Sequence, residues 1–214
     1  MTNRKIWLLL VGVCFLTYAN SLNNQFVSDE LDSIVNNPRI AEPMSFWLFP
    51  SMALNCVNYL IAKINTFVYH LTNILLHAFA TVLVFIFLRL FFAKMASFLA
   101  ALLFATLAIH AEAVTLVSGR PYIMTTVMLL LCYFLYYRAT AGFRPLIDAE
   151  DERRAPFLHR VAAWEKPSFG FYAACLVLFA YYLWNNFAFF FLFPLFIMLS
   201  DLTFRFSRKK GKAW

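Results

Sequence analysis

Charged side chains are scarce in this sequence. They make up 14% of its 214 residues, against 63% hydrophobic and 19% aromatic residues. A chain of this length needs more polar surface to be a soluble globule. The sequence therefore predicts an all-α, polytopic integral membrane protein.

Cysteines are also few, and their spacing excludes two further classes. The four cysteines stand far apart, so neither a disulfide framework nor a metal-spaced cluster follows. No predicted span carries a run of ionisable residues, which argues against a channel or transporter. The net charge of +7 does not indicate nucleic acid, because the basic residues flank the hydrophobic runs.

Long apolar runs are what the sequence has in abundance. A span needs roughly 20 such residues, and six segments qualify or nearly do. They are residues 6–22, 69–92, 96–114, 122–137, 169–184 and 187–204. The first could be a cleaved signal peptide, but residues 18–21 make a poor cleavage site, so we favour a retained anchor.

The segments between the spans complete the predicted organisation. Residues 1–204 form one transmembrane module, with a long first loop over residues 23–69 and a second polar loop over 138–168. Apolar residues recur at helical spacing from Met52 to Ile64, which predicts an interfacial helix in the first loop. Residues 205–214 are a basic tail.

The distribution of basic residues predicts the orientation. All of the 18 lysines and arginines except Arg39, Lys63 and Arg120 fall on one side if the spans alternate. The positive-inside rule then makes both termini cytoplasmic. We expect the protein in a bacterial inner membrane, with the first loop on the outer face.

Polar residues near the predicted outer face are the candidate functional groups. Asp29 and Glu30 follow the first span closely, where a carboxylate can be a catalytic base or simply part of a solvated loop. His70, Asn73 and His77 share one face of the second span. That face either packs against neighbouring helices or lines a substrate cavity. A zinc site is less favoured, because no third ligand is evident.

Charges of both signs gather on that outer face. Asp29, Glu30, Glu112 and Arg120 all lie there in the predicted topology. Arginine can bind a phosphate and aspartate can accept a proton. This combination is suited to a reaction on a phosphate-bearing lipid.

Several blocks resemble the GT-C glycosyltransferases, especially the transmembrane and tetratricopeptide-repeat mannosyltransferases and their bacterial relatives. The blocks are Asp29-Glu30, Asn37-Pro38, residues 69–78 with His-Leu-Thr-Asn, residues 110–114 with His-Ala-Glu-Ala-Val, and Ser118-Gly119-Arg120. The resemblance implies inverting sugar transfer from a polyprenyl-phosphate donor, with Asp29 as base and Glu30 beside it. We infer from charge and sidedness that Arg120 binds the donor phosphate. The other candidate substrate-binding residues are Glu112, His110, His70 and Asn73. Neither a metal nor a cofactor other than the lipid-linked sugar is implied.

Departures from the family pattern leave two functions open. Phe49-Pro50, Leu107-Ala108 and Asn185-Asn186 replace an Arg-Pro, a His-Pro and a Lys-Glu pair, respectively. The sequence also has six predicted spans and no helical repeats. We therefore expect a module that is incomplete or degenerate on its own. The alternative is a non-catalytic accessory subunit that packs against other membrane protein chains.

Overall fold

The computed structural model describes residues 2–42, 50–139 and 169–185. Within these ranges all regular structure is helical, which confirms the predicted fold class. The sixth predicted span, the basic tail, Asn186 and nearly all of the second polar loop lie outside the described residues.

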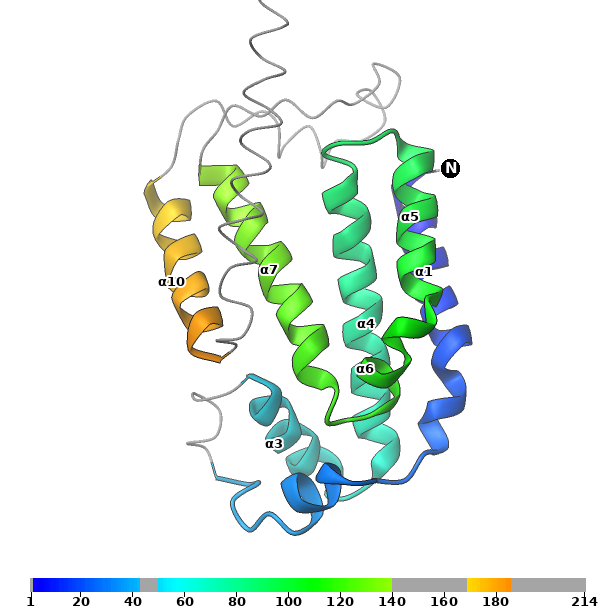
Figure 1. Ribbon diagram of the computed structural model, residues 1–214, viewed down its shortest axis with the longest axis vertical. Coiled ribbons are helices and arrows are strands. Elements are labelled where there is room, and N and C mark those ends of the chain that lie inside the picture. The colour runs from blue at the N-terminus through cyan, green and yellow to red at the C-terminus, as the bar shows by residue number, and fades with distance from the viewer. Residues whose placement is uncertain (1, 43–49, 140–168, 186–214) are drawn as a thin grey trace, which may run out of the picture.

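Three helices pack together along one side of the bundle (Figure 1). They are α1 (Asn3–Tyr18), which continues as a 3-10 turn to Asn23, α4 (Thr66–Leu88) and α5 (Lys94–Thr106). Small buried residues allow these helices to approach closely. Cys14, Ala78 and Ala105 form one such contact cluster, as expected for membrane helices that associate by close packing.

The third predicted span is broken. Helix α5 ends at Thr106, Leu107 is extended, and the chain resumes as η3 (Ala108–His110) and α6 (Ala111–Thr115) at an angle of 49°. The predicted third span over residues 96–114 is therefore a bent pair of helices, which passes as one span only if the pair is counted together. The break directs α6 back towards α4.

Two further helices continue the bundle on the other side of α4 (Figure 1). Helix α7 (Arg120–Ala139) packs against α4, and α10 (Phe169–Asn185) packs against α7. The buried Cys132 and Cys175 meet between them, where the Cys175 thiol donates to the Cys132 carbonyl at 3.3 Å.

The first loop covers one end of the bundle. It contains one π-helical turn, η2 (Leu31–Val35), and helix α3 (Pro50–Ala62). The bounds of α3 differ by two residues at each end from those of the predicted interfacial helix, Met52 to Ile64. Residues 24–42, α3, α6 and the start of α7 all lie at this end (Figure 1). We call it the loop end, and the opposite end the far end.

Two described helices are long and apolar enough to cross a membrane. They are the segments Asn3–Asn23 and Thr66–Leu88, and the bent α5–α6 pair makes a third if it is counted as one span. Residues 120–136 of α7 form a shorter apolar helix.

Candidate functional site

Arg120 is the centre of the polar contacts at the loop end. Its side chain is fully buried at the start of α7. The guanidinium donates through Nε to Asn73 Oδ1 at 2.8 Å, through one terminal nitrogen to Asn55 Oδ1 at 2.6 Å, and through the other to the Tyr69 carbonyl at 3.1 Å. Arg120 thus joins α7 to α3 and α4.

All three acceptors of Arg120 are neutral. Among the residues that the structure describes, no carboxylate forms an ion pair with the guanidinium, and Glu30 acts on it only through space. Buried charges in proteins are normally paired, because desolvation of an ion is expensive. The positive charge of Arg120 is therefore incompletely compensated.

Glu30 joins two segments of the loop end through its carboxylate. It is fully buried, and its carboxylate accepts backbone N–H groups from Val27, Val117 and Ser118. These bonds fasten the first loop to the turn before α7. Charged acceptors make such bonds stronger than neutral ones, so Glu30 is an anchor for the loop that carries Asp29.

Asp29 itself is exposed, next to this anchor. Its carboxylate accepts the Ser28 hydroxyl at 3.2 Å. Ser28 has a φ of 50°, a left-handed conformation that is costly for a residue other than glycine. Of the two adjacent acids, Glu30 therefore lies inside the fold and Asp29 at its surface. Glu112, on α6, is also exposed.

Asn73 connects the same turn to α4. Its amide donates to the carbonyls of Val114 and Leu116 at 3.3 and 2.7 Å, while its oxygen accepts from Arg120. Both ends of this amide are used, so Asn73 fixes the turn and orients the arginine.

His70 is buried one turn before Asn73. Its side chain is 1% exposed, and neither ring nitrogen has a hydrogen-bond partner of ordinary geometry in the described part of the chain. The ring lies near the Asn24 and Thr115 carbonyls and the Glu30 carboxylate. It fills the junction between the first loop, α4 and α6.

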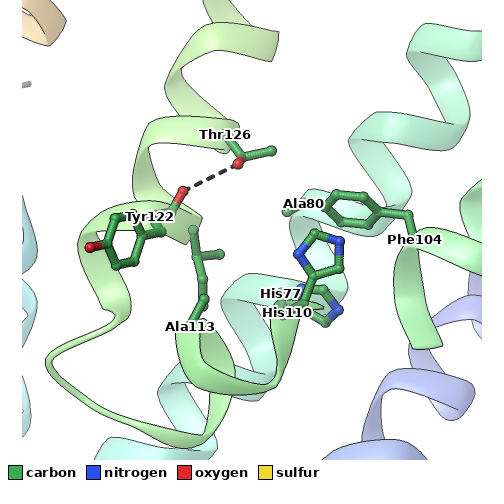
Figure 2. Close-up of a pocket in the computed structure, with 8 residues that line it drawn as sticks. His77, Ala80, Phe104, His110, Ala113, Tyr122 and Thr126 are labelled. Carbon is green, nitrogen blue, oxygen red and sulfur yellow. Dashed lines mark hydrogen bonds between the residues drawn. The ribbon is translucent and has the colours of Figure 1, made fainter. Parts of the chain in front are cut away.

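His77 and His110 meet deeper in the bundle, beside a cavity of about 60 Å³. Their ring centroids are 5.5 Å apart, and the His77 ring stacks on Phe104 at 5.4 Å. Figure 2 shows the two imidazoles from α4 and η3 facing Tyr122 and Thr126 of α7. Such a cavity has room for about two waters. His77 of the α4 stripe thus lines this cavity together with His110.

The structure brings Glu30, His70, Asn73 and Arg120 together through the turn before α7, and it groups His110 with His77. Asp29 and Glu112 lie at the surface of the same end. Nowhere in residues 2–42, 50–139 and 169–185 do three metal-binding side chains converge.

Two residues of this arrangement were not assigned a role from the sequence. Asn55 falls inside the predicted interfacial helix without a predicted role, and it accepts a hydrogen bond from Arg120. Gly119 was only part of a motif. A Cβ at Gly119 would lie 2.7 Å from the Ala113 Cα and from the Glu112 carbonyl oxygen, so only glycine allows α6 to approach the start of α7 this closely. The Ser-Gly-Arg block was a signal that could have identified it.

Comparisons with known proteins agree with the motif resemblance. The chain is 31% identical over 158 residues to the human protein O-mannosyl-transferase TMTC3. This alignment covers 64% of this chain and 17% of that protein. It is 34% identical over 155 residues to human TMTC1, covering 61% of this chain and 18% of the relative. Over 149 residues it is 34% identical to Tmtc1 of Drosophila melanogaster, with 59% and 17% covered.

These relatives confirm the predicted partial homology to protein O-mannosyl-transferases. The matched region is less than a fifth of the length of each of the three relatives. No protein-family model and no solved structure matches the chain. The apolar helices and the relatives together indicate an integral membrane module similar to glycosyltransferases.

Proposed function

We propose that this chain is the part of a membrane glycosyltransferase that holds the acid which activates the acceptor. The donor is a polyprenyl-phosphate sugar at the outer or lumenal face, and transfer inverts the sugar. The observation that carries the proposal is the anchor at Glu30, which ties the Asp29 loop to the turn leading into Arg120. An exposed acid and a buried cation are thereby held at the same end of the bundle.

The chemistry of the step assigns each group a role. Asp29 accepts the proton of an acceptor hydroxyl as its oxygen attacks the anomeric carbon, and the bond from that carbon to the phosphate oxygen breaks. The departing polyprenyl phosphate carries the negative charge, which Arg120 stabilises. Glu112, His110, His70 and Asn73 are the remaining substrate-binding candidates, with Asn73 orienting the arginine. The catalytic unit extends over residues 1–204, with residues 205–214 as a cytoplasmic tail.

One observation favours a second function. Arg120 has no exposed surface and its contacts are all internal. A closed arrangement of this kind suits a non-catalytic subunit that packs with other membrane protein chains. The exposed apolar residues of the chain, such as Leu16 and Ile109, which are 83% and 81% exposed, would then contact lipid or a partner.

Turnover of a defined donor separates the two functions. The chain is reconstituted in liposomes with polyprenyl-phosphate mannose and a hydroxyl-bearing peptide acceptor, and Asp29→Asn is compared with the wild type. Loss of a general base should lower the rate by about 10²- to 10⁴-fold. Asp32→Asn, which removes another exposed acid of the same loop, is the matched control and should leave the rate unchanged. Equal turnover in Asp29→Asn would remove Asp29 as the base, and no turnover in the wild type would favour the accessory subunit.

The sidedness of the proposal is tested separately. Ser33 lies at the loop end and Ala93, before α5, at the far end. Thiols introduced by Ser33→Cys and Ala93→Cys should react with a membrane-impermeant maleimide from opposite sides, the former from outside. Labelling of both from one side would contradict the proposed topology.

A further inference from the structure

We propose that the small cavity between η2 and α3 is the outer part of a phosphate-ester site, and that Asn55 is a displaceable cover between this cavity and the Arg120 guanidinium. This inference deepens the proposed function and rests on it for the identity of the lipid. It concerns how an anion would reach an arginine that is fully buried.

The electrostatics of Arg120 call for an anion. Its charge lies in the first turn of a 20-residue helix that has no acidic residue there, and the N-terminal end of a helix is itself positive. Cation and helix end therefore repel each other, and both favour a negative group. The neutral oxygens of Asn55, Asn73 and Tyr69 supply only partial compensation.

Of these three acceptors, Asn55 is the one that can leave. Asn73 and Tyr69 are 0% exposed, and Asn73 is held by two further bonds to the turn before α7. Asn55 is half-buried, and within the described part of the chain its side chain makes one hydrogen bond, accepting from Arg120. Rotation of this amide away from α7 breaks one contact and uncovers the guanidinium.

The space outside Asn55 is a small cavity lined by both polar and apolar side chains. It measures about 30 Å³, and the described residues that line it, Ser33, Asn37, Ile40, Met52 and Asn55, include no acidic side chain. That volume holds about one water, so a phosphate group fits only when the Asn55 amide swings out. The movement that uncovers Arg120 is the same one that makes room for the ligand. The half-buried Ser33 hydroxyl can then donate to a phosphate oxygen.

The test uses labelling of a cavity position as a readout that needs no sugar transfer. The full chain is placed in phosphatidylcholine nanodiscs and carries Ser33→Cys. Its four native cysteines are buried, so a maleimide reports the introduced thiol. The ligands tested for protection against labelling are farnesyl phosphate, farnesol and inorganic phosphate. Farnesyl phosphate should slow the labelling, whereas farnesol, which lacks the anion, should not.

Three variants on α3 separate a cover from a structural residue. Asn55→Ala removes the amide and should lower the half-protecting concentration of farnesyl phosphate by about tenfold, the equivalent of ~1.4 kcal/mol. Asn55→Asp places a carboxylate against Arg120 and should abolish protection while raising the thermal midpoint. Asn58→Ala is the matched control, because Asn58 lies one turn along α3 and bonds Thr72. It should leave protection unchanged.

Several outcomes would overturn the inference. These are equal protection by farnesol, unchanged protection in Asn55→Asp, and weaker binding in Asn55→Ala. Equal protection by inorganic phosphate would support the anion site and assign it to a water-soluble phosphate. Protection without sugar transfer would contradict the proposed function alone, whereas full transfer activity in Asn55→Asp would contradict the inference alone.

Discussion

Two arginines are buried at opposite ends of this helix bundle, and their surroundings differ in kind. Arg89 is 1% exposed at the far end, where it caps the C-terminus of α4 and donates to the Phe92 carbonyl at 2.9 Å. Arg120 is 0% exposed at the loop end, where it begins α7. One cation thus lies at the negative end of a helix and the other at the positive end.

The comparison separates a structural charge from one available for function. A cation at a helix C-terminus is stabilised by the helix dipole and by the free carbonyls there. A buried cation at an N-terminus opposes the dipole and lowers stability unless something else compensates it. The fold itself accounts for Arg89, whereas Arg120 is explained better by an anion that it binds.

Removing the Arg120 charge should mainly lower ligand binding and sugar transfer, whereas removing the Arg89 charge should mainly lower stability. This is the largest effect we expect. Arg120→Gln should reduce farnesyl phosphate protection and any sugar transfer by about 10²- to 10³-fold, the usual effect of removing a group that stabilises developing charge. Its free energy of unfolding should change by less than about 1 kcal/mol, because relief of the buried charge offsets the lost hydrogen bonds. Arg89→Gln should leave both activities intact and destabilise the protein by about 1 to 2 kcal/mol.

Ligand protection and denaturant unfolding in nanodiscs measure the two quantities on the same samples. Arg120→Lys is the control that keeps the charge and loses the planar fork, and it should fall between the wild type and Arg120→Gln in binding. A strongly destabilised Arg120→Gln that still binds phosphate would reverse the comparison and make Arg120 the structural residue.

Much of the helical framework could be predicted because it follows from apolarity alone. Helix α4 begins three residues before the predicted Tyr69, because the Asn65 side chain caps it by accepting from the Phe67 amide. The shared face of His70, Asn73 and His77 is also as predicted, and all three are buried. These features depend on local sequence and on helical periodicity.

Other features depend on contacts between distant segments. Nothing local breaks the helix at Leu107, where the sequence has neither proline nor glycine. The break accompanies the packing of His110 against Phe104 and His77, at ring centroid distances of 4.4 and 5.5 Å. In the same way, the amides at Val117 and Ser118 bury Glu30 and leave Asp29 exposed. The sequence of two adjacent acids does not indicate which of them is buried.

The turn before α7 and the middle of α1 should also differ in how tightly the backbone is packed. At the loop end, Gly119→Ala would place a Cβ 2.7 Å from backbone atoms of residues 112 and 113. We expect a loss of about 1 to 3 kcal/mol in unfolding free energy, with weaker phosphate protection because the turn before Arg120 shifts. The matched control is Gly12→Ala in α1, where a Cβ meets nothing within 4 Å. It should be neutral or stabilising by up to about 1 kcal/mol. Equal effects of the two would mean that α6 and α7 are not in close contact.

The smallest expected effect concerns backbone strain at the loop end. Ser28 and Lys63 have φ values of 50° and 53°, which glycine adopts without the penalty of a side chain. Both Ser28→Gly and Lys63→Gly should therefore stabilise the protein by about 0.5 to 1 kcal/mol, measured as a shift in the denaturation midpoint. Their effects on sugar transfer should differ, because Ser28 directly precedes and hydrogen-bonds the proposed base, while Lys63 follows α3. Strain at a functional site persists because the surrounding structure imposes it, and in Ser28→Gly the Asp29 carboxylate is freed to leave its position. Ser28→Gly should accordingly be more stable and slower, whereas Lys63→Gly should be more stable and equally fast. If Ser28→Gly is stabilised with its rate unchanged, the conformation at Ser28 belongs to the fold of the loop and not to the placement of Asp29.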